Sequence, residues 1–250
     1  MIEFNTVSLC LNNRTILRNL SFQIKKGQTA LLVGSSGAGK STILRLILGL
    51  LKPTAGRITI MGKNIAQMSE NELNDMRQKF GLVFQNGALF DSLTLEENVG
   101  FFLSENTNVS EQQVRTRVLD IMNFLGLENY LDYYPSEISG GMRKRVSIAR
   151  AIVTNPDVLL YDEPTAGLDP FAARKVVGLM KDLQSRFQVT SLIVTHEIHH
   201  FEKVVDRLLM LKNGSITYDG VYNLAILDEF EESEAPLECI AEEEFYADIE

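Results

Sequence analysis

The stretch Gly34-Ser35-Ser36-Gly37-Ala38-Gly39-Lys40-Ser41 contains a glycine, four further residues and then Gly-Lys-Ser. The apolar run before it, residues 29–33, predicts a buried strand, and residues 42–48 follow with the apolar spacing of a helix. Glycines placed between a strand and a helix let backbone N–H groups approach a polyphosphate, and the helix N-terminus adds a favourable dipole. A plain Gly/Ser turn between two buried elements is the alternative, but these flanking elements favour a nucleotide-binding loop.

Each part of this loop has an expected role. Lys40 is expected to reach the outer phosphates, and the Ser41 hydroxyl is expected to ligate Mg²⁺. The other loop positions are predicted to surround the nucleotide, and these are Gly34, Ser35, Ser36, Gly37, Ala38, Gly39 and Thr42.

Length and composition favour one α/β domain with a full core, because 250 residues can bury enough apolar surface. No apolar stretch approaches the ~20 residues of a membrane-spanning helix, and Glu3 and Asn5 interrupt any signal-peptide pattern. Cys10 and Cys239 lie far apart without metal-site spacing, which argues against a disulfide scaffold or a zinc site. We therefore expect a soluble, cytoplasmic chain.

The net charge of −9 is concentrated at the C-terminus. Residues 227–250 hold eleven Asp or Glu and no Lys or Arg, which leaves 24 basic and 22 acidic residues in positions 1–226. No basic stripe is present, so a nucleic acid is not expected as the main ligand. The composition predicts a folded domain over residues 1–226 and an acidic tail over residues 227–250. The tail is either a solvated end or, through spaced hydrophobic residues such as Phe230 and Phe245, a segment that docks on a neighbour.

Short apolar runs bounded by turn residues predict strands on both sides of a helical stretch. Strands are expected at 4–11, 20–24, 57–61, 81–85, 158–161 and 191–195, followed by a hairpin of 208–211 with 215–218. Capping boxes predict helix starts at Ser69, Thr94 and Ser110, and Asp169 followed by Pro170 predicts another. We expect an α-helical subdomain, about residues 86–156, inserted in an α/β core.

Two carboxylates end the apolar run of residues 158–161. Asp162 is expected to hold Mg²⁺ through its water shell, and Glu163 to polarise the attacking water as general base. Burial explains the apolar run, but it does not explain two adjacent acids at its end.

A second glycine loop, Ser139-Gly140-Gly141-Met142, precedes a basic helix and can present free N–H groups. Such a loop is common as a plain helix start, and its position shortly before Asp162 is what makes it informative. If the two glycine loops lie on different subdomains, one chain cannot bring both to one phosphate. A head-to-tail dimer would solve this.

Together these residues resemble the ATP-binding subunit of an ABC transporter over about residues 1–220. Residues 34–41 resemble Walker A, Gln85 the Q-loop, residues 139–142 the signature, residues 158–163 Walker B, residues 166–169 the D-loop and His196 the switch histidine. The resemblance implies a P-loop NTPase core (the ABC ATPase fold) with an antiparallel β subdomain and an inserted α-helical subdomain. It also implies ATP hydrolysis with Mg²⁺, and two ATP molecules held between two chains.

The resemblance further implies individual residue roles. The implied catalytic residues are Glu163, His196 and Gln85, and the implied Mg²⁺ ligands are Ser41, Gln85 and Asp162. Ser139, Gly140, Gly141 and Asp169 would complete the nucleotide site. A lone histidine at a strand end is usually only solvated, so the role of His196 depends on the order of the motifs.

Three positions depart from the common pattern. Met142 stands where many members have Gln, Ile138 replaces Leu, and Leu11 lies where an aromatic residue usually stacks on adenine. The last departure puts the preference for ATP over GTP in question.

Three parts of the sequence resemble the Mla/Mce-type lipid-transport ATPases. They are the segment from Gln85 to Thr94, the following Glu97-Asn98-Val99 and the Ser-Gly-Gly-Met signature. That resemblance implies phospholipid transport with integral-membrane permease subunits and an MCE-type substrate-binding protein, at the cytoplasmic face of the inner membrane. Phe90 is expected in the permease-docking groove, although an ordinary hinge packing is equally compatible with it. The alternatives are another ABC importer or exporter, and a soluble ABC ATPase of scaffold assembly or DNA repair.

Overall fold

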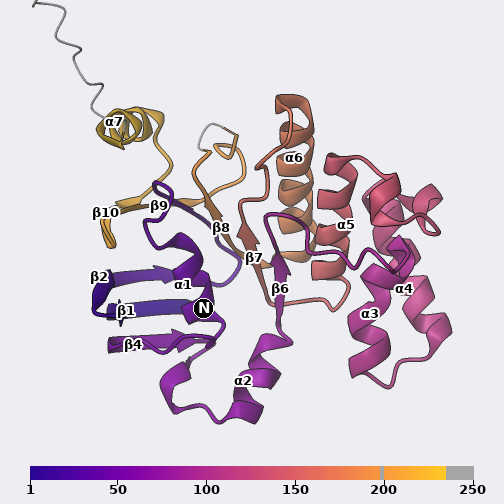
Figure 1. Cartoon of the computed structure of the whole chain (residues 1–250), viewed down its shortest axis with the longest axis horizontal. Coiled ribbons are helices and arrows are strands. Elements are labelled where there is room, and N and C mark those ends of the chain that lie inside the picture. The colour runs from indigo at the N-terminus through magenta and orange to yellow at the C-terminus, as the bar shows by residue number, and fades with distance from the viewer. Residues whose placement is uncertain (198–199, 235–250) are drawn as a thin grey trace, which may run out of the picture.

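The computed structural model describes residues 1–197 and 200–234. Cys239 and the part of the acidic tail after Glu234 lie outside the described residues. The chain forms layers around a central sheet, as Figure 1 shows. Helix α1 (Lys40–Ile47) and a second sheet cover one face, and helices α5 (Gly140–Ile152) and α6 (Pro170–Phe187) cover the other.

The central sheet has six strands in the order β10-β9-β3-β8-β7-β6, and all pairs are parallel except β9 with β10. Their bounds are β3 (Thr29–Val33), β6 (Phe80–Val83), β7 (Val158–Asp162), β8 (Thr190–Thr195), β9 (Arg207–Lys212) and β10 (Ser215–Gly220). The inner strands are apolar on both faces because both faces are covered by other layers. Asn213 and Gly214, both with positive φ, close the expected hairpin between β9 and β10.

The second sheet is antiparallel, in the order β2-β1-β4-β5. Its strands are β1 (Ile2–Leu11), β2 (Arg14–Ile24), β4 (Ala55–Ile60) and β5 (Lys63–Asn64). The strand expected at 20–24 begins earlier, because Asn12 and Asn13 have positive φ (48° and 60°) and return the chain at once. The strand expected at 57–61 ends at Ile60, because Met61 and Gly62 turn with φ of 50° and 82°.

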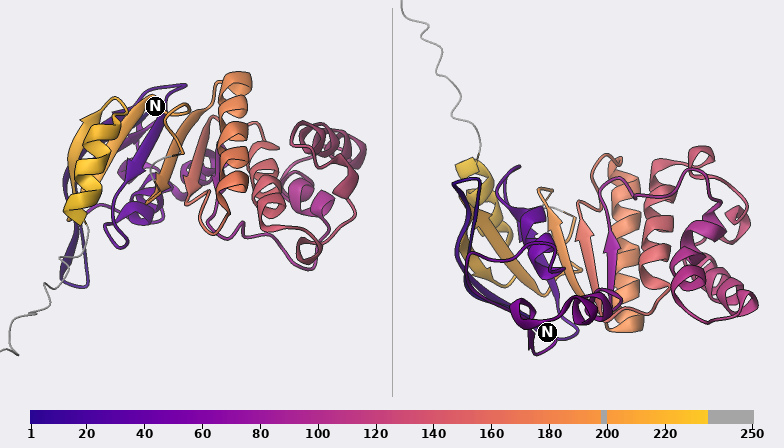
Figure 2. Two further views of the ribbon diagram at one scale, coloured as in Figure 1. Left: turned by 90° about the horizontal axis from the view of Figure 1, so that it is seen from above. Right: turned by 60° about the horizontal axis from the view of Figure 1, so that its bottom comes forward.

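The helices begin where their caps predict. Capping boxes form at Ser69, Thr94 and Ser110 before α2 (Glu70–Arg77), α3 (Leu95–Asn106) and α4 (Glu111–Phe124). The helix expected at 42–48 begins two residues earlier, at Lys40. Short 3₁₀ turns are η1 (Ile65–Gln67), η2 (Glu128–Tyr130) and η3 (Pro135–Glu137). Figure 2 shows α3 and α4 at one end of the molecule, opposite the C-terminal helix.

The segment between β6 and α3 differs from expectation. The strand predicted over 81–85 ends at Val83, and the helical stretch predicted from residue 86 begins only at Leu95. Gly87 and Ala88, with φ of 74° and 47°, turn the chain between them. Gln85 is therefore in a turn rather than in a strand.

Helix α7 (Leu224–Glu234) crosses position 227, where the composition indicated the start of the tail. Leu227 is fully buried and Phe230 nearly so, and both belong to the core that α5 and α6 share. No helix among the described residues is long and apolar enough to cross a membrane.

Candidate functional site

The expected site residues gather where the parallel strands end. Gly34 follows β3, Asp162 ends β7, and His196 follows β8. Strand β8 lies between β3 and β7, so these three segments are neighbours. The carboxyl edge of an open α/β sheet is where such folds bind ligands.

The glycine loop after β3 has the backbone geometry of an anion site. Gly37 and Gly39 have φ of 81° and 108°, in the left-handed region that favours glycine. Gly39 precedes α1 and has no side chain to cap its first N–H groups, which suits an incoming phosphate. The buried Lys40 donates through Nζ to the carbonyl oxygens of Gly34 at 2.6 Å and Ser35 at 3.0 Å. The ammonium thus lies inside the loop that would surround the phosphates.

A hydroxyl and a carboxylate meet at the first turn of α1. Ser41 Oγ donates to Asp162 Oδ1 at 3.3 Å. Burial raises the pKa of Asp162, the neighbouring Glu163 acts in the same direction, and the hydrogen bond from Ser41 opposes them. These are the oxygen ligands that Mg²⁺ prefers, and a cation would relieve the cost of the half-buried charge. Ser41 and Asp162 therefore fit Mg²⁺, and the described residues contain no larger cluster of His, Cys, Asp or Glu that could hold a metal.

Glu163 is held in one orientation by residues of two other segments. Thr195 Oγ1 donates to Glu163 Oε2 at 2.9 Å, and His196 Nδ1 lies 2.9 Å from Glu163 Oε1. Lys40 Nζ is 3.8 Å from the same Oε1 atom. Glu163 has a φ of 50°, an uncommon value for a residue other than glycine, and its N–H donates to the carbonyl of Val194 at 2.8 Å. The carboxylate thereby faces His196 and the Lys40 ammonium of the glycine loop.

Two residues that the motifs did not single out belong to this site. Thr195, the last residue of β8, is fully buried and orients Glu163, and only its position beside His196 could have indicated this. Lys144 on α5 is also buried, and its ammonium donates to the backbone carbonyls of Gln85 and Glu163. The basic run Arg143-Lys144-Arg145 gave no sign that its middle member points inward.

The second glycine loop, residues 139–142, and residues 166–169 adjoin each other on the α5 and α6 side of the sheet. Ser139 accepts a hydrogen bond from Met142 N at 3.3 Å and so caps α5. Asp169 caps α6, accepting from the N–H groups of Phe171 and Ala172, and these bonds lower its pKa. Helix α1 packs on the opposite face of the central sheet. The two glycine loops therefore lie at the starts of helices on different faces.

The hairpin of β1 and β2 reaches the glycine loop through β2, and β1 ends in Leu11 rather than in an aromatic residue. Leu11 is 39% exposed and pairs with Arg14 of β2. Further along β2, Leu17 packs closely beside Gly39. A base that contacts this end of the sheet would meet aliphatic side chains.

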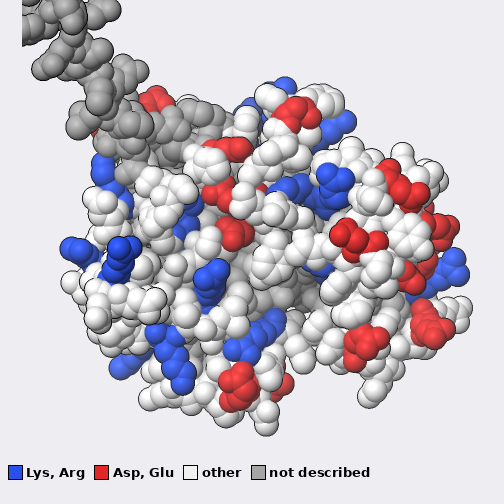
Figure 3. All heavy atoms as spheres, viewed as in Figure 1, with Lys and Arg blue, Asp and Glu red and all other residues white. Residues whose placement is uncertain are grey.

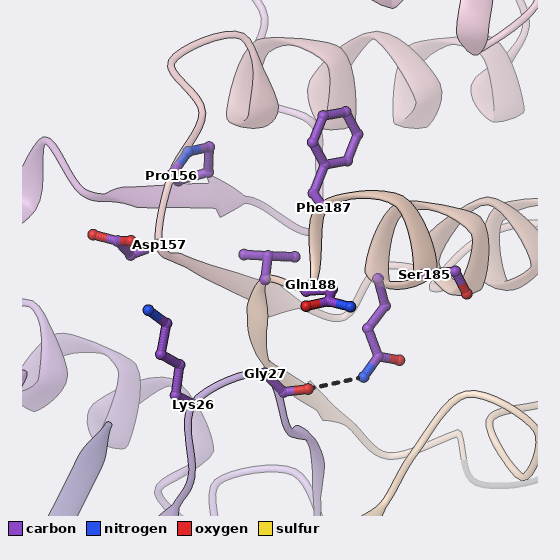
Figure 4. A pocket seen from close by; sticks show the side chains of 9 residues that line it. Lys26, Gly27, Pro156, Asp157, Ser185, Phe187 and Gln188 are labelled. Carbon is purple, nitrogen blue, oxygen red and sulfur yellow. Dashed lines mark hydrogen bonds between the residues drawn. The ribbon is translucent and has the colours of Figure 1, made fainter.

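A separate hollow lies at the amino edge of the central sheet. It has a volume of 810 Å³ and is lined by Lys26, Gly27, Asp157, Gln188 and their neighbours, as Figure 4 shows. Gln184 Nε2 donates to the carbonyl of Gly27 there, at 3.2 Å. Because β3, β7 and β8 begin at this edge, the hollow is at the opposite end of the strands from Lys40 and Glu163 and takes no part in their site.

Comparison with known proteins agrees with this geometry. The family model described as "ABC transporter" matches residues 17–166. The methionine import ATP-binding protein MetN of Carboxydothermus hydrogenoformans is 40% identical over 203 residues, which are 81% of this chain and 60% of that protein. Protein TRIGALACTOSYLDIACYLGLYCEROL 3, chloroplastic, of Arabidopsis thaliana is 41% identical over 238 residues, covering 88% of this chain and 68% of that protein.

Two solved structures show the same fold. The dimeric ATP-binding cassette MJ0796, bound to ADP and Pi in a post-hydrolysis state, aligns with a TM-score of 0.79 and 32% identity, over 89% of this chain and 99% of that one. The cbiO1 protein of Clostridium perfringens, part of the ABC transporter complex cbiONQ, aligns with a TM-score of 0.84 and 29% identity over 95% of each chain. The family match, these relatives and the shared fold lead to one conclusion: the chain belongs to the ABC transporter family and is an ATP-binding domain of that family that acts as an ATPase.

Proposed function

We propose that ATP hydrolysis occurs at the carboxyl edge of the central sheet with Glu163 as the general base. The observation that carries this is the placement of its carboxylate, which Thr195 and His196 hold within 3.8 Å of the Lys40 ammonium. Lys40 binds the outer phosphates, and His196 and Gln85 contact the γ-phosphate side. Ser41, Asp162 and Gln85 would hold Mg²⁺, which when bound neutralises phosphate charge.

The test is steady-state ATP hydrolysis and ATP binding by the full-length chain. Glu163→Gln keeps the shape but cannot take a proton, so kcat is expected to fall ~10²–10⁴-fold with ATP binding retained. Lys40→Ala is expected to lose both binding and turnover. Asp157→Asn, an exposed carboxylate just before the other end of β7, is the matched control. Turnover by Glu163→Gln at the parent rate would show that the base is another residue.

We also propose that two chains pair head to tail, so that each signature closes on the glycine loop of the other chain. The opposite-face positions of α1 and α5 support this, because one chain cannot easily bring both loops to one phosphate. On the face in Figure 3, acidic side chains gather over α3 and α4 and basic ones over the antiparallel sheet, so the two ends of the chain differ in charge there. Ser139, Gly140, Gly141 and Asp169 would then complete the partner's site.

In this proposal residues 1–226 are the ATPase domain, with the helical subdomain at about 86–156, and the acidic tail at 227–250 begins inside α7, whose Leu227 and Phe230 pack into that domain. The segment between β6 and α3 is the docking surface for an integral-membrane permease. Phe84, Phe90 and Phe101 are each about two-fifths exposed, and the rings of Phe90 and Phe101 lie 4.9 Å apart. Exposed apolar groups of this kind commonly mark protein contacts. Asn98, fully buried, keeps the surface rigid by donating to the carbonyls of Phe90, Leu93 and Thr94.

For the cargo, we propose a phospholipid or related lipid, carried with a permease and an MCE-type binding protein at the cytoplasmic face of an inner membrane. The Gln85–Val99 segment and the Met142 signature support this, as does similarity to a relative that is named for a galactolipid. Methionine import is the second candidate. It is favoured by similarity to methionine import proteins of Carboxydothermus hydrogenoformans and of Bacillus cereus. This chain spans only 60% of the length of the first of these.

The two cargoes are distinguished by affinity purification of the tagged chain from detergent-solubilised membranes. Mass spectrometry of proteins and lipids is expected to find a permease, an MCE-type protein and bound phospholipid. Recovery of a permease without lipid, together with methionine-stimulated ATPase activity, would favour methionine import. Recovery of soluble partners alone would contradict both cargoes.

A further inference from the structure

Lys144 is a lysine on the second turn of α5 with only 6% of its surface exposed. Its ammonium donates to the main-chain carbonyl of Glu163 at 3.1 Å and to that of Gln85. Burial lowers its pKa, while the carboxylates of Glu163, Glu197 and Asp162 oppose that shift. A charge buried at this cost is usually retained for a specific contact.

The two carbonyls belong to turns that follow neighbouring strands. Gln85 follows β6, Glu163 follows β7, and these strands pair in parallel. The same helix begins at the signature, since Ser139 is its N-cap. One side chain thus joins the signature helix, the turn at the start of the proposed docking segment and the turn that carries the base.

The contact with Glu163 bears on the orientation of its carboxylate. Glu163 has a positive φ, so its backbone needs external contacts to keep this conformation. Val194 holds its N–H and Lys144 holds its carbonyl. Movement of α5 would therefore move this peptide and the carboxylate attached to it.

We propose that Lys144 is a positioning residue that couples the Gln85 turn to the Glu163 turn, so that the position of α5 determines whether the base is aligned. The inference rests on the proposed role of Glu163. It assigns Lys144 no contact with ATP. The site can then be aligned or misaligned by motion of the helical subdomain without loss of nucleotide.

The same helix offers a matched control. Arg150 lies six residues further along α5 and donates to the carbonyls of Gly87 at 2.9 Å and Ala88 at 2.6 Å. It holds the turn that contains Gln85, but neither of these bonds reaches Glu163. Arg150→Met therefore weakens the hold on the turn while leaving the bond from Lys144 to Glu163.

The experiment compares Lys144→Met, Lys144→Arg and Arg150→Met in the full-length chain, each in the parent and in the Glu163→Gln background. Single-turnover hydrolysis and calorimetric ATP binding are measured. Lys144→Met is expected to lower the hydrolysis rate about tenfold or more with ATP Kd changed less than about twofold. Lys144→Arg, which keeps several donors, is expected to recover most of that rate. In the Glu163→Gln background, Lys144→Met is expected to cause no further loss of hydrolysis rate. Any effect of Arg150→Met on that rate is expected to persist.

A rate for Lys144→Met within about twofold of the parent, or a full further loss in the Glu163→Gln background, would overturn this inference and leave the base assignment intact. A parent-like rate for Glu163→Gln alone would overturn the base assignment and, with it, this inference. Thermal unfolding checks that each variant folds. Lys144→Gln, which keeps an amide donor, replaces Lys144→Met if the latter does not fold.

Discussion

At the scale of single residues, the site contains a carboxylate whose environment disfavours its charge. Asp162 is half-buried beside Glu163, and its pKa is raised, chiefly by burial. A raised carboxyl pKa means that the folded chain favours the protonated form. The protonated Asp162 therefore favours the folded state at low pH, and this contribution to stability is lost as the pH rises through the pKa of Asp162 in the folded chain.

Asp162→Asn removes this charge, so the nucleotide-free variant is expected to be more thermostable than the parent at pH 7 to 8, in EDTA. The gain should shrink as pH falls and vanish below about pH 4, the usual pKa of Asp. Thermal midpoints measured across this pH range give the comparison. A difference in thermal midpoint between variant and parent that stays constant at all pH values would contradict the view that the charge of Asp162 destabilises the fold. Excess Mg²⁺-ATP should make the parent more thermostable than Asp162→Asn, because only the parent keeps the carboxylate that is proposed to hold Mg²⁺.

At the scale of elements, α7 is packed against the core although its sequence is strongly acidic. Leu227 is fully buried, while Leu224, one turn earlier on the same helix, is 42% exposed. Leu227→Ala is expected to lower the free energy of unfolding by about 2–4 kcal/mol, through lost burial and the cavity that remains. Leu224→Ala, the matched control, should change it by less than about 0.5 kcal/mol. Urea unfolding measures both, and equal losses would mean that the helix does not pack by this face.

At the scale of the whole molecule, the proposed dimer can be tested through the signature glycines. A Cβ atom added at Gly140 would lie 3.7 Å from the nearest atoms of Arg143 and Leu168, an ordinary contact distance, so we expect the isolated chain to accommodate a small side chain there. Such a side chain would instead obstruct the nucleotide held by the other chain. The variant therefore separates pairing from folding.

In the Glu163→Gln background, ATP is expected to produce a dimer, twice the 28.1 kDa of one chain, by light scattering after gel filtration. Gly140→Asp added to it should abolish the dimer while ATP binding to each monomer stays within about threefold. Gly178→Asp, on α6 with open space beside it, is the matched control and should still pair. An ATP-dependent dimer that persists in Gly140→Asp would contradict the head-to-tail arrangement.

Features that depend on neighbouring residues along the chain could be predicted from the sequence. The capping boxes at Ser69, Thr94 and Ser110 form as expected, because a cap is made within four residues. The turn at Gln85 was missed, because the apolar run Leu82-Val83-Phe84 extends beyond the end of β6 at Val83, and the apolar pattern does not reveal the positive φ of Ala88. The Asn12-Asn13 turn was missed as well, although Asn commonly tolerates this conformation.

The sequence by itself determined the glycine loop, the strand that ends in Asp162 and Glu163, and the order of motifs that indicates the ATPase family. Those features are local, since backbone freedom, periodicity and capping act over a few positions. Only the tertiary structure decided that Thr195 and His196 orient Glu163, that Lys144 points inward to two carbonyls, and that Leu227 is buried. The reason is physical: Lys144 lies 59 positions from Gln85, and contacts over such separations exist only once the sheet and α5 have packed together.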